Sequence, residues 1–432
     1  MLRRFLNHEA TRGSVLSILD QGILSISNFL TGILVARAVG AEDFGVYSLL
    51  FAGLMVLAGA QNALITGPLR VLGVQSRGSG TYFKAQLRLQ LMLSGVLATG
   101  AMLVMSFGTH LSLTAIFTFS FCLIFFQLQE LARIINLTKL TLKSLLIMDV
   151  FTNGLRIGLL LFMSEQGMLT PISALLAIAL SCGVGVAIYL RGHGVKGGST
   201  MPLSVVAAEN WGYGRWLLLE TLAYTASTQA YLYFTALWVD KQSAGALNAV
   251  LSMLNMVNVL QLGVMAFAIP RARQKLMEYG YYVWRRWMLQ VGFVLTVSTA
   301  FIMLLVTLFA KPLLVHLYTP FYGDYAYLLP VLASSYVLTT LNSVLNAAFL
   351  TALLPKAGFM AKAVSGIVTL LLAYPVISKW GVAGAAAGLL ATTATWSLVY
   401  FLYVYKGGLS LERIGKMISN DLAVPIVGLK AK

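Results

Sequence analysis

Residues 14–50 read SVLSILDQGILSISNFLTGILVARAVGAEDFGVYSLL, and this stretch decides the class of fold. Its first part, from Ser14 to Ala36, is an apolar run long enough to cross a bilayer. Polar side chains lie within that run at Asp20, Gln21, Ser27, Asn28 and Thr31. At 3.6 residues per turn, most of them share about one third of the helix circumference. Because an unsatisfied polar group in hydrocarbon costs several kcal/mol, we expect this face to contact protein or a hydrated cavity.

The composition of the whole chain agrees with a membrane protein. The 432 residues are 59% hydrophobic and only 10% charged, with a mean hydropathy of +0.83. A soluble protein has about 25% charged residues. An outer-membrane barrel is excluded because the apolar runs are about 20 residues long and do not alternate. The sequence therefore predicts an all-α polytopic membrane protein.

The apolar runs predict about 12 transmembrane helices, at the typical length of a spanning segment. They are 14–36, 44–66, 85–107, 111–136, 143–163, 169–190, 213–238, 243–268, 287–309, 325–350, 355–378 and 381–405. With both termini in the cytoplasm, most of the 30 lysines and arginines fall on the cytoplasmic side. The exceptions are Arg37, Lys241, Lys311 and Lys379 outside and Arg156 within a span. The net charge of +16 is thus a topology signal for the cytoplasmic membrane, with attraction to anionic lipid, and predicts no nucleic-acid partner.

A Gly-rich segment divides the chain into two sets of six predicted spans. We expect an N-terminal lobe at 1–190, a cytoplasmic linker at 191–212, a C-terminal lobe at 213–405 and a basic cytoplasmic tail at 406–432. An offset of 200 aligns Asp20 with Glu220, Ser27 with Ser227, Val39 with Val239, Gly45 with Gly245 and Gln61 with Gln261. Repeats of equal orientation are related by an axis along the membrane normal, with the substrate path between them. The sequence therefore predicts two six-helix lobes around a central cavity.

Polar faces recur in several predicted spans. They run through Asp149, Asn153 and Arg156; Glu220, Tyr224, Ser227 and Tyr231; Asn248, Ser252 and Asn255; and Ser335, Thr339, Asn342 and Asn346. Such residues can bridge packed helices, or they can line a hydrated path. On the second interpretation the candidate substrate-binding residues are Asn28, Thr31, Asn153, Arg156, Tyr224, Tyr231, Asn255 and Asn342.

The ionisable residues in the spans have two interpretations each. A central arginine costs at least about 2.5–3.5 kcal/mol on insertion, so Arg156 either binds an anionic ligand or forms an ion pair with Asp149 or Glu130. Asp20, Asp149 and Glu220 are candidates for ion coupling or for structural pairing. Glu130 and Arg133 are expected to pair at an interface, and Arg37 to anchor the outer end of the first span. Tryptophans and tyrosines at span ends, Trp284 among them, are expected in the interfacial belt.

No cofactor or metal is expected. Cys122 and Cys182 each lie in an apolar run without metal-ligand spacing, and the four histidines are far apart. The predicted outside loops are short, the longest being about Ala310–Asp324. An enzyme acting on membrane lipids needs room there for an acid, base or cation cluster, so the loops argue against an enzyme.

Several stretches resemble one family of transporters. They are GILVARAVGAEDFGVYSLL (Gly32–Leu50), the turns Pro68-Leu69-Arg70 and Pro270-Arg271-Ala272-Arg273, KPLLVHLYTPFYGDYAYLLPVL (Lys311–Leu332) and WGVAGAAAG (Trp380–Gly388). They are similar to bacterial polysaccharide transporters, the O-antigen flippases of the Wzx type. These belong to the multidrug/oligosaccharidyl-lipid/polysaccharide exporter superfamily.

This resemblance implies a V-shaped pair of six-helix lobes that works by alternating access. It also implies a substrate, a polyprenyl-diphosphate-linked oligosaccharide flipped to the outer leaflet, and a polysaccharide polymerase or assembly complex as partner. Lipid II flippases of the superfamily carry arginines within the first helix, whereas this chain has none between Arg12 and Arg37. The diphosphate contact is therefore assigned to Arg156. The alternative is a cation-coupled drug or metabolite exporter of the same superfamily.

Overall fold

The computed structural model describes residues 2–70, 80–108, 111–139, 141–193, 201–255, 258–352, 354–410 and 412. All regular secondary structure in these ranges is helical, which confirms the predicted all-α class. The elements are α1 (Leu2–Ala38), α2 (Ala41–Gln61), the π-helix η1 (Asn62–Thr66), α4 (Gly80–Gly108), α5 (Leu113–Thr138), α6 (Leu142–Glu165), α7 (Pro171–His193), α8 (Leu203–Thr228), α9 (Ala230–Trp238), α10 (Lys241–Asn255), α11 (Asn258–Leu308), α12 (Ala310–Leu317), α13 (Pro320–Gly323), η2 (Ala326–Leu328), α14 (Leu329–Thr351) and α15 (Pro355–Tyr405).

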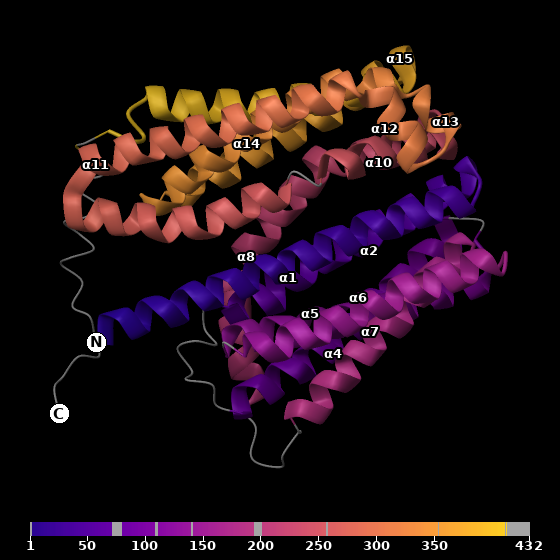
Figure 1. Cartoon of the computed structure of the whole chain (residues 1–432), viewed down its shortest axis with the longest axis horizontal. Coiled ribbons are helices and arrows are strands. Elements are labelled where there is room, and N and C mark those ends of the chain that lie inside the picture. Colours follow the sequence, from indigo (N-terminus) through magenta and orange to yellow (C-terminus); the bar gives the residue numbers. More distant parts are fainter. Residues whose placement is uncertain are drawn as a thin grey trace.

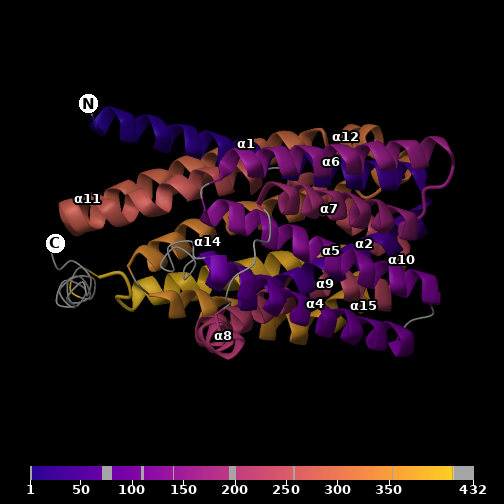
Figure 2. The ribbon, with the colours of Figure 1, turned by 90° about the horizontal axis from the view of Figure 1, so that it is seen from below.

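The helices gather in two bundles that follow the order of the chain. In the first, α1 packs on α6, α5 packs between α4 and α7, and α6 packs on α7. In the second, α14 packs between α11 and α15, and α15 also covers α8 and α9. Figure 1 shows the first bundle below and the second above. Figure 2, turned by 90°, shows the same helices again running lengthwise, so their axes lie roughly along one direction.

Two of the longest helices fold back on themselves at a glycine. Gly280 in α11 has φ 80° and Gly381 in α15 has φ 55°, a region that glycine adopts without the Cβ penalty of other residues. A Cβ built on Gly384 would lie 2.7 Å from the carbonyl carbon of Val376, so the two parts of α15 run side by side. The predicted spans 243–268 and 287–309 left a connecting segment between 268 and 287. The chain stays helical there up to Gly280, because a helix can extend past its apolar part into a charged, exposed turn.

We name the two ends of the molecule by these features. The Gly280 end holds the bend of α11 and the start of α1, and the Arg37 end holds the end of α1, the bend of α15 and α12 with α13 (Figure 1). The two bundles are in contact where α2 packs on α10, and where α8 packs on η1 and α4. Toward the Gly280 end the ribbons of α1 and α11 diverge.

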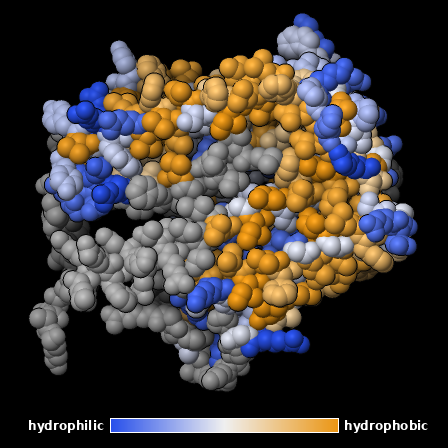
Figure 3. Space-filling view, in the orientation of Figure 1, coloured by the Kyte–Doolittle hydropathy of each residue, from blue (hydrophilic) through white to orange (hydrophobic). Residues whose placement is uncertain are grey.

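The surface of the bundles is apolar over most of its length. Within the described ranges, nine helical stretches are long and apolar enough to cross a membrane, two of them being Gln274–Leu308 and Lys356–Tyr405. Figure 3 shows hydrophobic side chains over the middle of the upper bundle and hydrophilic ones at both of its ends. The chain is therefore a multi-pass membrane protein.

Candidate functional site

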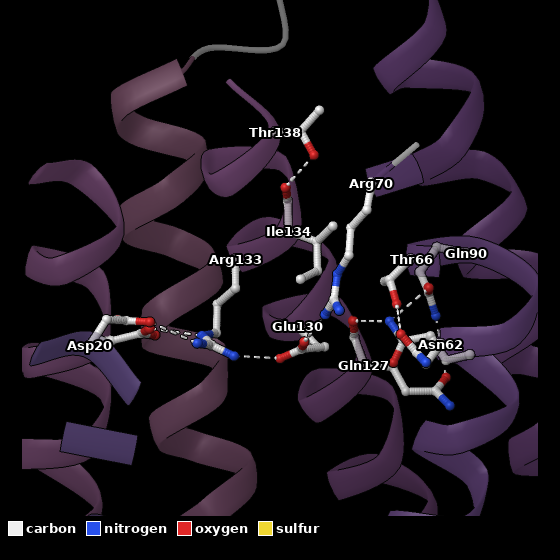
Figure 4. A network of polar contacts seen from close by, with 12 residues as sticks. Asp20, Asn62, Thr66, Arg70, Gln90, Gln127, Glu130, Arg133, Ile134 and Thr138 are labelled. Carbon is white, nitrogen blue, oxygen red and sulfur yellow. Dashed lines mark hydrogen bonds and ion pairs between the residues drawn. The ribbon is translucent and has the colours of Figure 1, made fainter. Parts of the chain in front are cut away.

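A buried ionic cluster ties three helices of the first bundle together. Arg133 on α5 bonds Asp20 of α1 (Nη2–Oδ2, 2.9 Å), Glu130 one turn earlier (Nη1–Oε2, 2.8 Å) and Asp149 of α6 (Nε–Oδ2, 2.7 Å). Figure 4 shows Arg133 pointing between Asp20 and Glu130. We call these four residues the Arg133 cluster. Its guanidinium uses all three nitrogens, which is the geometry a buried ion network needs to offset desolvation.

Three members of the cluster are shielded from solvent, whereas the side chain of Glu130 is 27% exposed. Asp20, Arg133 and Asp149 are 1%, 7% and 0% exposed. Gln129 adds a hydrogen bond from Nε2 to Asp149 Oδ1 at 3.4 Å, and Arg70 reaches Glu130 at 3.8 Å from a more exposed position. The interpretation of Asp149 or Glu130 as the ion-pair partner of Arg156 is therefore wrong, because both carboxylates bond Arg133.

Arg156 lies on α6, in the same bundle, and has a different kind of partner. Its Nη1 donates to Oδ1 of Asn28 on α1 at 2.9 Å. Arg156 is 3% exposed, whereas Asn28 is exposed. Arg156 Nε is buried without a hydrogen-bond partner among the described residues. Because Arg156 holds the amide oxygen of Asn28, the amide nitrogen of Asn28 is the group left to donate to a ligand.

Two other predicted residues of this bundle are buried one turn away, Thr31 from Asn28 on α1 and Asn153 from Arg156 on α6, and we call these four residues the polar seam. Thr31 is 1% exposed and Asn153 is 3% exposed. Asn153 donates from Nδ2 to the backbone oxygen of Asp149 at 2.7 Å. Thr31 Oγ1 and Asn153 Oδ1 have no partner among the described residues. Buried polar atoms in that state are the places where ordered water is usually found.

A neutral network of amides crosses the first bundle near η1. Gln61 donates from Nε2 to Gln90 Oε1 at 2.9 Å and to the backbone oxygen of Gln127 at 2.7 Å. Ser94 and Gln90 donate in turn to Gln127 Oε1 at 2.7 and 3.3 Å. Figure 4 shows Gln90 and Gln127 close to Asn62 and Thr66 of the π-helix. Gln261, which the offset of 200 aligns with Gln61, is also buried, and it donates a hydrogen bond to Thr340.

The polar core of the second bundle is built mainly from hydroxyl and amide groups. Asn342 donates to the backbone oxygen of Thr393 at 3.1 Å and accepts from Ser397 at 2.9 Å. Thr392 Oγ1 lies 2.7 Å from Thr369 Oγ1 and 3.4 Å from the hydroxyl of Tyr231. Asn342 and Tyr231 are 2% and 0% exposed, so these two predicted binding residues connect helices.

One ion pair of the second bundle is partly open. Lys362 of α15 bonds Glu220 of α8, with side chains 18% and 34% exposed. Lys362 Nζ also lies 5.8 Å from the ring of Tyr224, which is 43% exposed and packs against Trp396. Asn255, also exposed, accepts a hydrogen bond from Tyr336. Asn28, Tyr224 and Asn255 are thus the predicted binding residues whose side chains are exposed.

The contact between the bundles at the Arg37 end is close. Asn248 of α10 donates to Ser48 Oγ of α2 at 2.9 Å, and these positions are related by the offset of 200. A Cβ on Gly245 would lie 2.9 Å from the nitrogen of Gly45, and one on Gly45 would overlap the backbone oxygen of Lys241. The contact is therefore reciprocal, as a two-fold axis requires.

Arg37 closes the same end. Its guanidinium donates to the backbone oxygens of Leu317 (2.9 Å), Tyr318 (3.2 Å) and His316 at the C-terminus of α12. A cation is favourable there because the last carbonyls of a helix lack helical partners. Phe44 packs beside it on Tyr318 and Tyr322. Arg37 is thus a link between the bundles rather than a lipid anchor.

Three features of the site differ from the expectations drawn from the sequence. Glu130 and Arg133 were predicted to form an interfacial pair from their i, i+3 spacing. The pair exists, but Arg133 also bonds Asp20 and Asp149. The amides of Gln90 and Gln127 were not predicted, and Lys362 was counted only among the cytoplasmic charges, whereas it bonds Glu220.

Comparison with known structures identifies the fold. An inward-facing multidrug resistance transporter of the MATE family, in the MOP superfamily, gives a TM-score of 0.78 at 16% identity over 92% of this chain and 96% of the other. An outward-facing transporter of the same description gives 0.66 at 17% identity over 94% and 95%. A MOP superfamily transporter from Pyrococcus furiosus, described as having a binding pocket of reverse polarity, gives 0.67 at 15% identity over 94% and 95%.

No protein-family description and no curated relative matches the chain. The structural likeness nevertheless extends over nearly the whole length. The chain has the fold of these MOP superfamily transporters, two of which are described in inward- and outward-facing conformations. Of these two MATE transporters, the inward-facing structure gives the higher TM-score.

Proposed function

We propose that this chain is a flippase that moves a polyprenyl-diphosphate-linked oligosaccharide from the inner to the outer leaflet of the cytoplasmic membrane by alternating access. It serves surface polysaccharide biosynthesis, as with O-antigen, and a polymerase or assembly complex would use its product. Its twelve spans form two six-helix lobes, 1–190 and 213–405, with the linker 191–212 and the tail 406–432 in the cytoplasm.

The observation that carries this proposal is the state of Arg156. It is a buried cation whose hydrogen-bond partner among the described residues is the neutral Asn28, while the nearby carboxylates are engaged by Arg133. A guanidinium without a carboxylate keeps its attraction for an anion such as a diphosphate. Asn28, held by Arg156 and exposed, would contact that anion directly. Tyr224 and Asn255 suit a hydroxyl-rich sugar.

The rival is a cation-coupled drug or metabolite exporter, which would use free carboxylates. In this chain Asp20 and Asp149 bond Arg133, and Glu220 bonds Lys362. These pairs support a structural role for the three residues more than ion coupling. With the inside negative, each negative charge moved outward gains about 2.3 kcal/mol per 100 mV, so the membrane potential can assist the proposed direction.

The test is flipping of a fluorescent polyprenyl-diphosphate oligosaccharide in proteoliposomes. Arg156→Gln should lower the initial rate by about 10- to 100-fold, because a hydrogen bond to a charged group contributes about 1.5–3 kcal/mol. Asn28→Ala should lower it as well. The matched control is Arg191→Gln, an exposed arginine outside the seam, which should leave the rate unchanged.

Three results would count against the proposal. An unchanged rate in folded Arg156→Gln removes Arg156 from the site. Efflux of a cationic dye, with no flipping of the lipid, favours the exporter. Flipping that is indifferent to both membrane potential and pH gradient excludes the proposed assistance by the potential and also any coupling to protons.

A further inference from the structure

A groove lies on the outward face of α11, just after the bend at Gly280. It has a volume of about 480 Å³ and is lined by Tyr282, Arg285, Arg286, Leu289, Gln290 and Phe293. The opposite face of the same helix, with Trp284 and Met288, is buried against α14 and α15. Trp284 is 2% exposed, so its expected place in the lipid belt is wrong. The groove therefore opens away from the protein core.

The groove continues toward the end of α15. A second hollow of about 370 Å³ shares Arg285 and Leu289 with the first and reaches the turn at Gly407–Ser410. Tyr281 lines this hollow, and its hydroxyl donates a hydrogen bond to the backbone oxygen of Leu409 at 3.0 Å. Arg285 thus lies at the junction of two hollows formed by three helices.

The two arginines of the groove are exposed and have no hydrogen bond or ion pair to any part of the chain that the structure describes. The aromatic side chains of Tyr282 and Phe293 line the same groove. Lys275 Nζ lies 6.0 Å from the ring of Trp287, and Tyr282 is 70% exposed. Rings and cations of this kind are typical of the membrane–water interface. In Figure 3 hydrophilic side chains gather at this end of the upper bundle, beside its apolar middle.

An apolar track leads from the arginines into the hydrocarbon. Leu289, Phe293 and Val297 follow one another at i+4 on the outward face and are 63%, 70% and 49% exposed. From Arg286 to Val297 the helix rises about 16 Å. One leaflet contributes about half of a 30 Å hydrocarbon core, so the track matches the length of an acyl chain.

We propose that this groove binds an anionic phospholipid of the leaflet at the Gly280 end. The phosphate contacts Arg285 and Arg286, and one acyl chain lies along Leu289, Phe293 and Val297. The two unpaired cations complement the phosphate charge, and the adjoining apolar face matches the chain. This site is separate from Arg156 and does not depend on the transported substrate.

The proposal is tested on the purified full-length chain, delipidated in detergent. Native mass spectrometry compares retention of phosphatidylglycerol with that of phosphatidylcholine of the same acyl chains. Arg285→Gln with Arg286→Gln should weaken phosphatidylglycerol retention about 25-fold, since each cation near an anionic surface contributes about 1 kcal/mol, or about fivefold. Lys143→Gln with Arg191→Gln removes two exposed cations of the first bundle and should change nothing.

Thermal unfolding of the lipid-free variants shows whether each is folded, and Arg285→Lys with Arg286→Lys should keep most of the binding. The proposal fails if the groove variant retains phosphatidylglycerol as the wild type does. It also fails if the control variant loses it equally, or if phosphatidylcholine competes as well. Displacement of phosphatidylglycerol by a polyprenyl diphosphate would assign the groove to that lipid instead.

Discussion

The two bundles differ in how their buried polar side chains are paired. The first concentrates charge, with Arg133 bonded to three carboxylates between α1, α5 and α6. The second spreads its polarity over neutral pairs such as Ser335 with Thr393 and Thr369 with Thr392, and leaves its ion pair partly exposed. Neutral pairs can be lost one at a time, whereas a charge hub fails as a unit. The first bundle should therefore be the more sensitive to single substitutions.

The largest expected effect is that of Arg133→Met. It leaves Asp20 and Asp149 buried without their cation, and breaking a buried pair in this way costs about 3–5 kcal/mol. Unfolding of the purified protein in mixed micelles measures the loss. Arg191→Met, at an exposed position, is the control.

Two further substitutions in the Arg133 cluster should restore the stability that Arg133→Met loses. Asp20→Asn and Asp149→Asn added to Arg133→Met turn the hub into a neutral network like that of the second bundle. Most of the lost stability should return, because the unpaired charges are gone. If Arg133→Met alone had a free energy of unfolding within about 1 kcal/mol of the wild type, the four residues would not act as one unit.

Gly45→Ala tests the place where the two bundles are most alike. Its methyl group would overlap the backbone oxygen of Lys241, and overpacking of this kind costs about 1–3 kcal/mol. The bundles should then separate at the Arg37 end. Slower disulfide formation between Ser48→Cys and Asn248→Cys, with Cys122 and Cys182 replaced by Ala, would report it.

The control for that experiment is Gly32→Ala, since a Cβ at Gly32 meets no atom within 4 Å. Equal disulfide rates in Gly45→Ala and the wild type would show that α2 and α10 adjust without opening.

A smaller effect is expected for Thr392→Val in the second bundle. It removes the hydroxyl that lies between Thr369 and Tyr231, at a cost of about 1–2 kcal/mol. The same unfolding assay applies. The control is Thr395→Val, whose hydroxyl bonds only the backbone of its own helix. A loss as large as that of Arg133→Met would overturn the comparison.

The smallest effect is expected for Glu220→Gln. The pair with Lys362 is partly exposed, and exposed pairs contribute about 0–1 kcal/mol. The difference in unfolding free energy should shrink further in high salt. Glu42→Gln, at the exposed pair with Lys241, is the comparison. A loss above about 2 kcal/mol would place a strong ion pair in the second bundle too.

The class of fold could be predicted because it depends on properties of single segments. Apolar length predicts a helix in lipid, since a spanning backbone must satisfy its own hydrogen bonds. The division between the last two spans was predicted at 378–381, and the bend is at Gly381. The offset that aligned Gly45 with Gly245 was also predictive, because those residues meet in space.

The site was harder to predict because it depends on which helices are neighbours. The polar face of α6 was found, yet its spacing could not show that Asp149 bonds Arg133 on α5 rather than Arg156 on its own helix. The polar faces along α8 and α9 and along α14 were likewise found, but the spacing of polar residues alone does not distinguish a face on a cavity from a face on a neighbouring helix. Tyr231 and Asn342 proved to be buried.

The bends at Gly280 and Gly381 have a consequence for biogenesis. Each joins two antiparallel helical parts with almost no loop, so each pair is expected to enter the membrane as one hairpin. In α15 the two parts already approach closely at Gly384 and Val376, on either side of the bend at Gly381. A flexible insertion at Gly381 would let the last helix partition into lipid alone, and pulse-chase protease protection would detect it as a delay in the arrival of Tyr405 at the interface.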